Sequence, residues 1–419
     1  MAELSSFCVE EGNAWLTEDW TGHGFWEEAP YWLKGFGDLA YVLDDATMKQ
    51  EIQKWIEAML SSQRDDGWFG PEINKASPRR KTSIEGIEVS GMPDLWPNAL
   101  MLSVLRSNYG HTGDERIIRH MLNYSDWLMA LPEDRFLVHW VDKRRGVEHL
   151  KNILWLYNVT GEKKLLELAH KIHRRTNDWV SGISRYHNVD FSECFYEPGL
   201  YSLLSGQQEH YDAVERNHAL VYDEFGQVPG GMFGGDEDMR PGYTGPRQAV
   251  ETCGMVEMMH SCELMLSEVD GLIKWADRCE DVAFNSYPAA LTAEMDGLRY
   301  LTAPNMPVSD AISKKPDIYN YGPMYLMDPY AHRCCQHNHA HGWPYYAEYL
   351  WLATADNGLC PMFCCASSVK AKVGDGRTVA LEQKTRYPFD ETIELSMSID
   401  EGSVDFPLYL RIPGWCNNP

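Results

Sequence analysis

The sequence HLKNILWLYNVTGEKKLLELAHKIHRRTNDW, residues 149–179, holds two amphipathic segments on either side of Thr160-Gly161. Apolar side chains recur at steps of three and four residues in both segments, as they do in helices that turn one face toward a core. The glycine marks a tight turn between them. The stretch therefore predicts an α-helical hairpin.

Similar hairpins recur about every 50 residues along the chain. The predicted helices are 31–43 with 51–63, 98–109 with 116–131, 149–158 with 163–179, 197–208 with 211–225, 252–266 with 273–290, and 342–353, which begins a sixth hairpin. Two helices per repeat are typical of an α-helical toroid or an open solenoid. Polar and aromatic loops precede most of the inner helices. We expect the closed (α/α)6 barrel, because these loops then converge at one mouth.

Two regions have a different pattern. Gly and Pro become frequent near 285–330, and Leu298-Arg299-Tyr300-Leu301-Thr302 is typical of a strand, which predicts a β insertion in the barrel. Segments 368–373, 378–383, 392–399 and 407–412 alternate apolar and polar residues. We therefore expect a barrel domain over 1–357 and a β-sandwich domain over 358–419. Four or five strands are few for a sandwich, so we expect an incomplete one in a piece of a longer protein.

Composition excludes some classes of function. The formal net charge is −25 and the pI about 4.9, so the surface repels phosphate backbones and we expect no nucleic-acid partner. The sequence contains no run of 18 apolar residues, so it does not predict a membrane span. The N-terminus lacks the pattern of a signal peptide, which favours the cytoplasm; a truncated N-terminus would allow a periplasmic or secreted protein. The odd count of eleven cysteines indicates reduced thiols.

The motif Arg333-Cys334-Cys335-Gln336-His337-Asn338-His339 is the clearest sign of chemistry. Adjacent cysteines do not readily form a disulfide with each other, because the bond would be strained. Upstream, Glu251-Thr252-Cys253 offers a carboxylate and a third thiol. Three thiolates and one carboxylate make a four-coordinate zinc shell, which fits a catalytic or a closed structural site.

The local pattern also indicates where these ligands lie. Glu251 and Cys253 are two residues apart and share a metal only where the backbone is not yet helical, so we place them at the entrance of a helix. We expect Cys334 and Cys335 on a loop before the helix that begins at Gly342.

A glycine-rich loop, PGGMFGGDED at 229–238, is a second candidate. Glycines let a backbone approach a ligand closely, and the carboxylates at the end of the loop are candidates for general acid chemistry. A solvated acidic loop fits the same residues.

Four motifs, in this order, resemble glycoside hydrolase family 127, which contains β-L-arabinofuranosidases. They are Gly230-Gly231 leading to Glu237, Glu251-Thr252-Cys253, Cys334-Cys335 and Arg411-Ile412-Pro413-Gly414-Trp415. The resemblance covers nearly the whole chain and implies an (α/α)6 barrel followed by β-sandwich domains. It implies zinc held by Glu251, Cys253, Cys334 and Cys335. It also implies that Cys334 is the nucleophile and that Glu237 is the general acid and then the base.

The resemblance implies further contacts with the sugar. His187 matches a substrate-binding histidine, although a structural histidine at a helix end also fits. Glu280 and Tyr300 match residues that contact the sugar and the nucleophile. Trp96 and Asn98 stand where the family often has a histidine, so we include both as substrate-binding candidates.

Two departures mark a divergent branch. The cysteine pair is followed by Gln336-His337-Asn338, where the arabinofuranosidases of the family tend to have prolines. Fewer residues separate Glu237 from Glu251 than in those enzymes. For an enzyme of such a branch, we expect the substrate to be another furanoside or an acidic branched sugar of plant pectin. His337, His339 and His341 either contact substrate or pack within the protein.

The leading hypothesis is a zinc-dependent retaining exo-glycoside hydrolase. Its substrate is an oligosaccharide or glycoconjugate with a terminal β-L-arabinofuranose-like residue. A non-catalytic carbohydrate-binding protein with structural zinc is one alternative. A lyase or epimerase on the same toroid, which relies on a His/Tyr or His/His pair, is another. The resemblance also implies a homodimer formed through the β domains.

Overall fold

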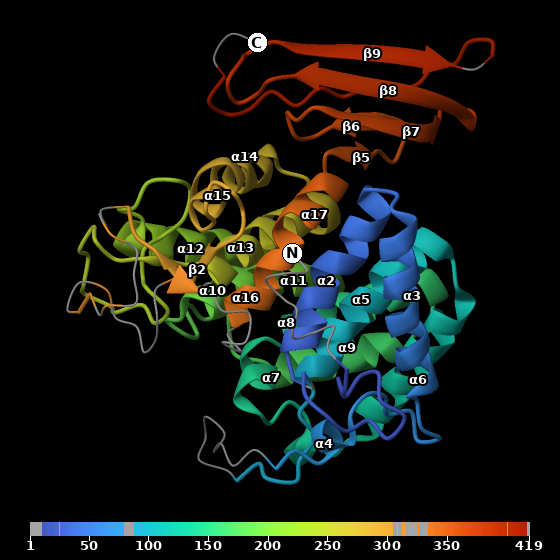
Figure 1. Ribbon diagram of the computed structural model, residues 1–419, viewed down its shortest axis with the longest axis vertical. Helices are drawn as coiled ribbons and strands as arrows, with labels where there is room; N and C mark the ends of the chain where they lie inside the picture. Colours follow the sequence, from blue (N-terminus) through green and yellow to red (C-terminus); the bar gives the residue numbers. More distant parts are fainter. Residues whose placement is uncertain are drawn as a thin grey trace.

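A helical body carries small β-sheets at one end (Figure 1). The computed structural model describes residues 11–24, 26–78, 88–304, 334–399 and 401–416. Between 304 and 334 it also describes residues 308, 312, 314, 315, 318, 325 and 326. This arrangement confirms the predicted fold class, mainly α with an all-β C-terminal part.

The long helices coincide with the predicted hairpins. They are α2 (Glu28–Val42), α3 (Ala46–Ser61), α5 (Trp96–Thr112), α6 (Glu115–Ala130), α8 (Val147–Thr160), α9 (Lys164–Arg175), α11 (Glu197–Ser205), α12 (Gln208–Phe225), α13 (Thr252–Leu264) and α14 (Ile273–Asp281). Shorter helices are α4 (Glu72–Lys75), α7 (Trp140–Arg144), α10 (Asn188–Cys194), α15 (Tyr287–Ala289), α16 (Cys334–Asn338) and α17 (Gly342–Glu348). Helices α4, α7, α10 and α16 were not predicted.

The inner helices form a closed ring. Helix α2 contacts α5, α5 contacts α8, and α8 contacts α11. Helix α10, which precedes α11 in the chain, contacts α13; α13 contacts α17, and α17 contacts α2 again. A ring that returns to its first helix is the (α/α)6 barrel rather than the open solenoid.

The turn predicted at Thr160-Gly161 is present. Helix α8 ends at Gly161, which has a φ of 71° and donates its N–H to the carbonyl of Tyr157. Glycine adopts this left-handed conformation without steric cost, so the chain reverses there into α9.

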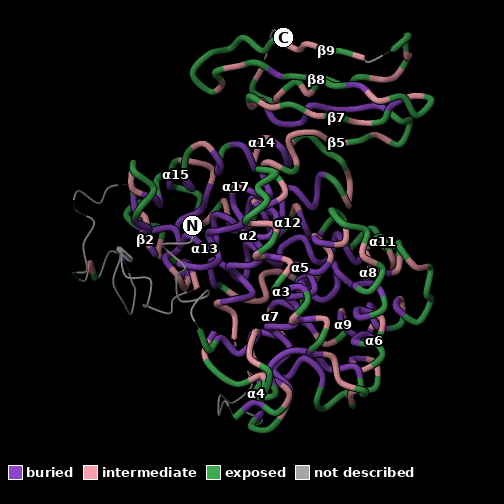
Figure 2. Tube along the Cα trace, turned by 45° about the vertical axis from the view of Figure 1, so that its right-hand side comes forward, coloured by how far each residue is buried: buried purple, intermediate pink, exposed green. Residues whose placement is uncertain are grey.

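The centre of the barrel contains buried ion pairs, where Figure 2 shows α2, α5 and α13 largely buried. Lys34 Nζ lies 3.3 Å from Glu257 Oε1, and Lys151 Nζ lies 2.6 Å from Glu148 Oε1, with all four side chains at most 2% exposed. His341 is also fully buried beside Glu257, and burial lowers its pKa to about 3. His341 therefore packs as a neutral imidazole.

The predicted β insertion is only partly strand. Strand β1 (Val250–Glu251) pairs with β3 (Leu301–Thr302), and β2 (Leu298–Arg299) pairs with β4 (Tyr325–Leu326), both antiparallel. Residues 285–289 are helical, so the insertion begins later than predicted. Much of 305–333 lies outside the described residues.

The C-terminal part has a short hairpin and a three-stranded sheet. Strand β5 (Trp351–Ala353) pairs with β6 (Leu359–Pro361), and the antiparallel sheet has the order β7 (Ser367–Val373), β8 (Arg377–Thr385), β9 (Ile393–Ile399). Leu359 packs against Val373, Val379 and Leu381 in a small core. These strands confirm three of the four predicted segments.

Two predictions for this region were wrong. Residues 351–353 are a strand rather than the end of a helix, because they pair with residues 359–361. Residues 407–412 are not a strand, since Leu408 alone forms a bridge, to Leu359. Pro407 lacks the N–H that a longer ladder needs.

Candidate functional site

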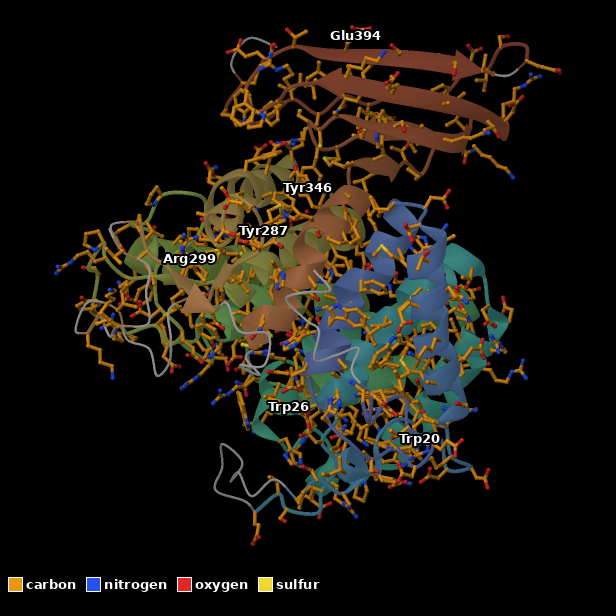
Figure 3. All side chains as sticks on the ribbon, viewed as in Figure 1. Trp20, Trp26, Tyr287, Arg299, Tyr346 and Glu394 are labelled. Atoms are coloured by element: carbon orange, nitrogen blue, oxygen red, sulfur yellow. The ribbon has the colours of Figure 1, made fainter. Side chains whose placement is uncertain are left out.

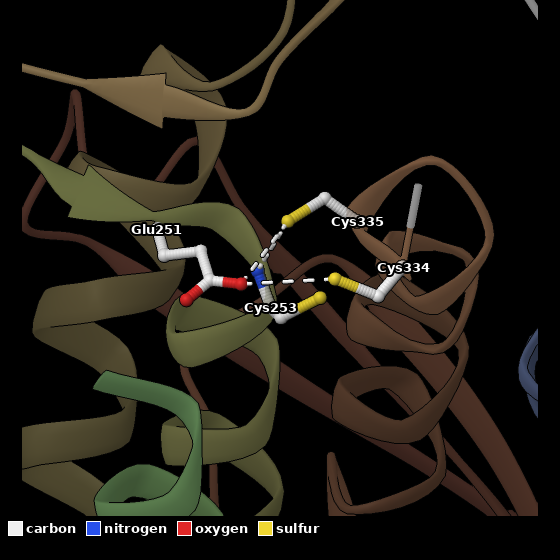
Figure 4. A group of neighbouring side chains, drawn as sticks. All are labelled: Glu251, Cys253, Cys334 and Cys335. Carbon is white, nitrogen blue, oxygen red and sulfur yellow. Dashed lines mark hydrogen bonds between the residues drawn. The ribbon is translucent and has the colours of Figure 1, made fainter. Parts of the chain in front are cut away.

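Helix starts converge at one mouth of the barrel. Cys253 is the second residue of α13, Cys334 the first of α16, and Trp96 the first of α5, while His187 caps the start of α10. Figure 4 shows the cysteines of α13 and α16 facing Glu251 at the end of β1. The N-terminal end of a helix stabilises anions, including thiolates.

Four predicted ligands form one cluster. The ligand atoms of Glu251, Cys253, Cys334 and Cys335 all lie within 4.8 Å of one another. Glu251 Oε1 is 3.8 Å from Cys334 Sγ and 3.6 Å from Cys335 Sγ. Ligands at zinc distances of about 2.0–2.3 Å in a tetrahedron are about 3.3–3.8 Å apart. The cluster therefore has the size of a zinc shell.

Backbone conformation brings the four together. Glu251 is extended, with φ −77° and ψ 135°, and the helix starts at the next residue, as predicted. The prediction of a loop for Cys334 and Cys335 was wrong, because both lie in the first turn of α16. The N–H of Cys253 donates to Cys335 Sγ at 3.4 Å and ties α13 to α16.

The site makes Cys334 differ from the other thiols. Hydrogen bonds from Cys253 and Cys335 lower the pKa of Cys334 well below that of an ordinary thiol. Burial raises the pKa of Cys253 and of Cys335. Cys334 is also half-buried, whereas the other two are fully buried. Cys334 is thus the most accessible and the most readily ionised of the three.

The donor set fits zinc. Three thiols and a carboxylate are characteristic zinc ligands, and a bound divalent ion stabilises their deprotonated forms. Glu251 Oε2 is buried, and within the described part of the chain it has no hydrogen-bond partner. Burial, followed by the charge of Cys334, raises the pKa of Glu251 well above its ordinary value. A cation between the carboxylate and the thiols would offset both effects.

Tyr300 lies beside the cluster, as predicted. The N–H of Thr252 donates to the carbonyl of Tyr300 at 3.1 Å, where β1 runs along β3. Tyr300 Oη lies 3.6 Å from Cys334 Sγ. This hydrogen bond also contributes to the lowered pKa of Cys334.

Glu237 is held beside the cluster through its backbone. The preceding Asp236 bridges to Val250, next to Glu251 in β1, and the following Asp238 bridges to His187. The Glu237 carbonyl accepts from the N–H of Asn188 at 2.9 Å. Its half-buried side chain is near enough that its charge helps to raise the pKa of Glu251 and of Tyr300.

His187 is next to Glu237 and also caps α10. Its Nδ1 accepts from the N–H of Asp190 at 3.3 Å. Burial lowers the pKa of His187. The structural role weighed for this histidine is present, and the bridge between His187 and Asp238 places it beside the Glu237 loop.

The two candidates on α5 point in different directions. Trp96 packs in a cluster that includes Tyr31 and Cys334, and its Nε1 donates to Glu27 Oε2 at 2.9 Å. Asn98 is fully buried and donates to the carbonyl of Phe69 at 2.8 Å. Residues two apart lie on different faces of a helix, so Asn98 packs in the core while Trp96 reaches the cysteines.

Glu280 lies at the junction with the β-sheets. Its carboxylate accepts from Arg411 Nη2 at 2.7 Å and from Tyr387 Oη at 3.3 Å, and it lies 3.4 Å from the N–H of Cys364. These contacts give Glu280 a role in joining the two regions, and the sugar contact that the resemblance implied stays a prediction.

Two further charged residues at the site were not predicted. Arg145 is buried, donating to Asp190 Oδ1 at 2.8 Å and to Tyr31 Oη at 2.9 Å, and its charge helps to lower the pKa of Cys334. Burial, and then the charge of Cys334, raises the pKa of Glu27 to about 8. Neither residue belongs to a recognisable motif.

The other two histidines near the cysteines are buried. His337 is fully buried in α16. His339 Nδ1 lies 3.1 Å from the carbonyl of Cys335, and burial lowers the pKa of His339 to about 4. Both belong to the packed interior behind the cluster.

Comparisons with known proteins place this chain in a family. The model described as "Beta-L-arabinofuranosidase, GH127 catalytic domain" matches residues 5–348, and that of the GH127 middle domain matches residues 360–419. A search of curated proteins finds no match. In the described residues, helices of the length and hydropathy needed to span a membrane are absent.

Solved structures share the fold. A crystal structure of a GH127 β-L-arabinofuranosidase from Geobacillus stearothermophilus T6 aligns with a TM-score of 0.68 at 18% identity, covering 100% of this chain and 69% of that one. Another GH127 β-arabinofuranosidase aligns with a TM-score of 0.67 at 18% identity, covering 99% and 66%. The two family matches cover most of the sequence, and this chain therefore belongs to the GH127 β-L-arabinofuranosidase family of glycoside hydrolases.

Proposed function

We propose that the protein is a zinc-dependent retaining exo-glycoside hydrolase that acts on a terminal β-L-arabinofuranose-like sugar. The observation that carries the proposal is the convergence of Glu251, Cys253, Cys334 and Cys335 at the mouth of the barrel. Tyr300 and the backbone-anchored Glu237 lie beside this cluster.

Exposure favours a catalytic site over a closed structural one. Structural zinc sites enclose all their ligands, whereas catalytic sites keep one position accessible. Cys334 alone among the three thiols is half-buried. Zinc bound by Glu251, Cys253, Cys334 and Cys335 would hold the thiolates ionised and act as a Lewis acid at sulfur.

Cys334 and Glu237 carry out the two steps of a double displacement. Cys334 Sγ attacks the anomeric carbon and forms a carbon–sulfur bond while the glycosidic C–O bond breaks. Glu237 gives its proton to the departing oxygen. Glu237 then takes a proton from water, whose oxygen replaces the sulfur at the anomeric carbon. Two inversions retain the configuration.

An aromatic wall next to Cys334 suits a sugar ring. Trp26 and Trp140, both partly buried, pack with Trp96 and Tyr31 in the cluster that Cys334 also contacts. Aromatic faces are apolar and match the C–H face of a sugar, while the indole of Trp96 is already fixed by Glu27. We infer that a terminal sugar lies between this wall and Glu237.

The test is a time-resolved NMR assay. With 4-nitrophenyl β-L-arabinofuranoside we expect free arabinose whose first-formed anomer is β, and the matched α-L-arabinofuranoside should remain intact. A first-formed α anomer would contradict retention. Unsaturated products absorbing in the ultraviolet would indicate a lyase, and tight sugar binding without turnover would indicate the carbohydrate-binding alternative.

A further inference from the structure

A cavity opens at the end of the barrel away from the cysteine cluster. Its volume is about 530 Å³, and its lining comes from later turns of α2, α5, α8 and α13 and from α17. In α5, Trp96 at the first residue lies by the cysteines, whereas His111 in the last turn lines the cavity, about 22 Å further along the helix. Figure 3 labels Trp26 away from the β-sheets and Tyr346, on α17, on the side of the helical body that faces the β-sheets.

Three metal-ligating side chains meet on the wall of this cavity. The ligand atoms of Asp38, His111 and Glu348 lie within 4.8 Å of one another. His111 Nε2 is 3.2 Å from Glu348 Oε1 and 3.8 Å from Asp38 Oδ1. Ligands of one metal ion at about 2.0–2.2 Å have separations of this size.

Neighbouring residues fix the orientation of the three. The Asp38 side chain is 2% exposed and accepts a hydrogen bond from Ser107 Oγ. The His111 ring stacks on Tyr41, with centroids 4.2 Å apart and planes 7° apart. The side chains of His111 and Glu348 are about one-third exposed and border the cavity, so an ion can enter.

The wall of the cavity also holds a buried hydrogen-bond acceptor. Asn152 lines the same cavity and is fully buried, and its Nδ2 donates to the carbonyl of Glu148 and to Ser103 Oγ. Its Oδ1 has no hydrogen-bond partner within the part of the chain that the structure describes. A buried acceptor of this kind needs a donor, which a water molecule in the cavity supplies.

We propose that Asp38, His111 and Glu348 bind a divalent transition-metal ion, with water completing its coordination inside the cavity. Two carboxylates and an imidazole accept Mn²⁺, whereas three thiolates favour zinc, so Mn²⁺ is a suitable probe for this end of the barrel. This site shares no residue with the cysteine cluster and does not depend on the proposed activity.

The simplest competing account is an ion pair. An imidazolium between two carboxylates would hold α2, α5 and α17 together without any metal. The two accounts differ in one measurable property, because an ion pair alone does not bind Mn²⁺ saturably.

Titration of the full chain with MnCl₂ distinguishes a metal site from an ion pair. The electron paramagnetic resonance signal of free Mn²⁺ reports how much of the ion is unbound. We expect one saturable site per chain and a dissociation constant at least about tenfold weaker in His111→Gln and in Glu348→Gln. The matched control, His170→Gln, removes a half-buried imidazole that contacts Tyr201 elsewhere and should bind like the parent. Bound Mn²⁺ should also raise the Tm of the parent but not of the two variants.

Two results overturn the proposal. Absence of saturable binding at millimolar Mn²⁺ would leave an ion pair only. Saturable binding that persists unchanged in both variants would place the ion elsewhere. Zinc content measured in the same samples should be equal in parent and variants, which keeps this test separate from the cysteine site.

Discussion

Replacing Cys334 with alanine should lower kcat/KM for an arabinofuranoside by about 10³-fold or more. The reason is that the other two thiols are fully buried and have raised pKa values, so neither can take over the attack. The measurement is a steady-state assay with an aryl glycoside. Cys365→Ala, which removes a half-buried thiol of the β region, is the matched control and should change the rate less than about twofold.

Cys334 is also a proposed metal ligand, so a second variant separates the two roles. Cys334→Ser keeps a donor atom in place but replaces the thiolate with a poor nucleophile. We expect it to retain measurable zinc and still lose activity to the same extent. Near-normal turnover by either Cys334 variant would show that another group attacks the sugar.

Replacing Glu237 with glutamine should produce a loss that depends on the leaving group. A general acid matters most when the departing oxygen is a poor leaving group, so an alkyl arabinofuranoside should lose about 10²–10⁴-fold in rate. With a 4-nitrophenyl arabinofuranoside, the rate of the first step should fall much less, and the glycosylated enzyme should accumulate. Intact mass spectrometry detects that adduct, and azide should restore turnover by replacing the water that Glu237 no longer activates.

Asp238→Asn is the matched control for Glu237→Gln. Asp238 is the next carboxylate in the loop, and its Oδ1 pairs with Arg185 at 2.9 Å. We expect Asp238→Asn to affect both substrates equally and only modestly. If Glu237→Gln also lost equal activity on both substrates, Glu237 would be a binding residue and the acid would lie elsewhere.

Local patterns predicted the parts of the structure that depend on local interactions. The hairpin at Thr160-Gly161 was readable because helix periodicity and a left-handed glycine are both properties of neighbouring residues. The metal cluster could be predicted from the sequence because each half of it, Glu251 to Cys253 and Cys334-Cys335, is contiguous. In contrast, Trp351 was assigned to a helix, because its pairing with Pro361 is a contact that periodicity does not contain.

The parts that were missed depend on contacts between distant segments. Arg145 reaches the site through Tyr31 on another helix, and Glu27 through Trp96 on a third. Asn98 and Glu280 were placed at the site by resemblance alone. The first instead packs on Phe69, and the second pairs with Arg411, more than 100 residues away in the chain. The positions of these two side chains depend on partners that a resemblance of single residues does not contain.

The central claim is that Glu251, Cys253, Cys334 and Cys335 hold one zinc ion. Elemental analysis of the purified chain beside Cys253→Ser tests it most directly, with circular dichroism to show that both are folded. We expect about one zinc per chain in the parent and a large loss in Cys253→Ser. A folded, fully reduced parent without zinc, or a Cys253→Ser variant that keeps its full zinc content, would contradict the account.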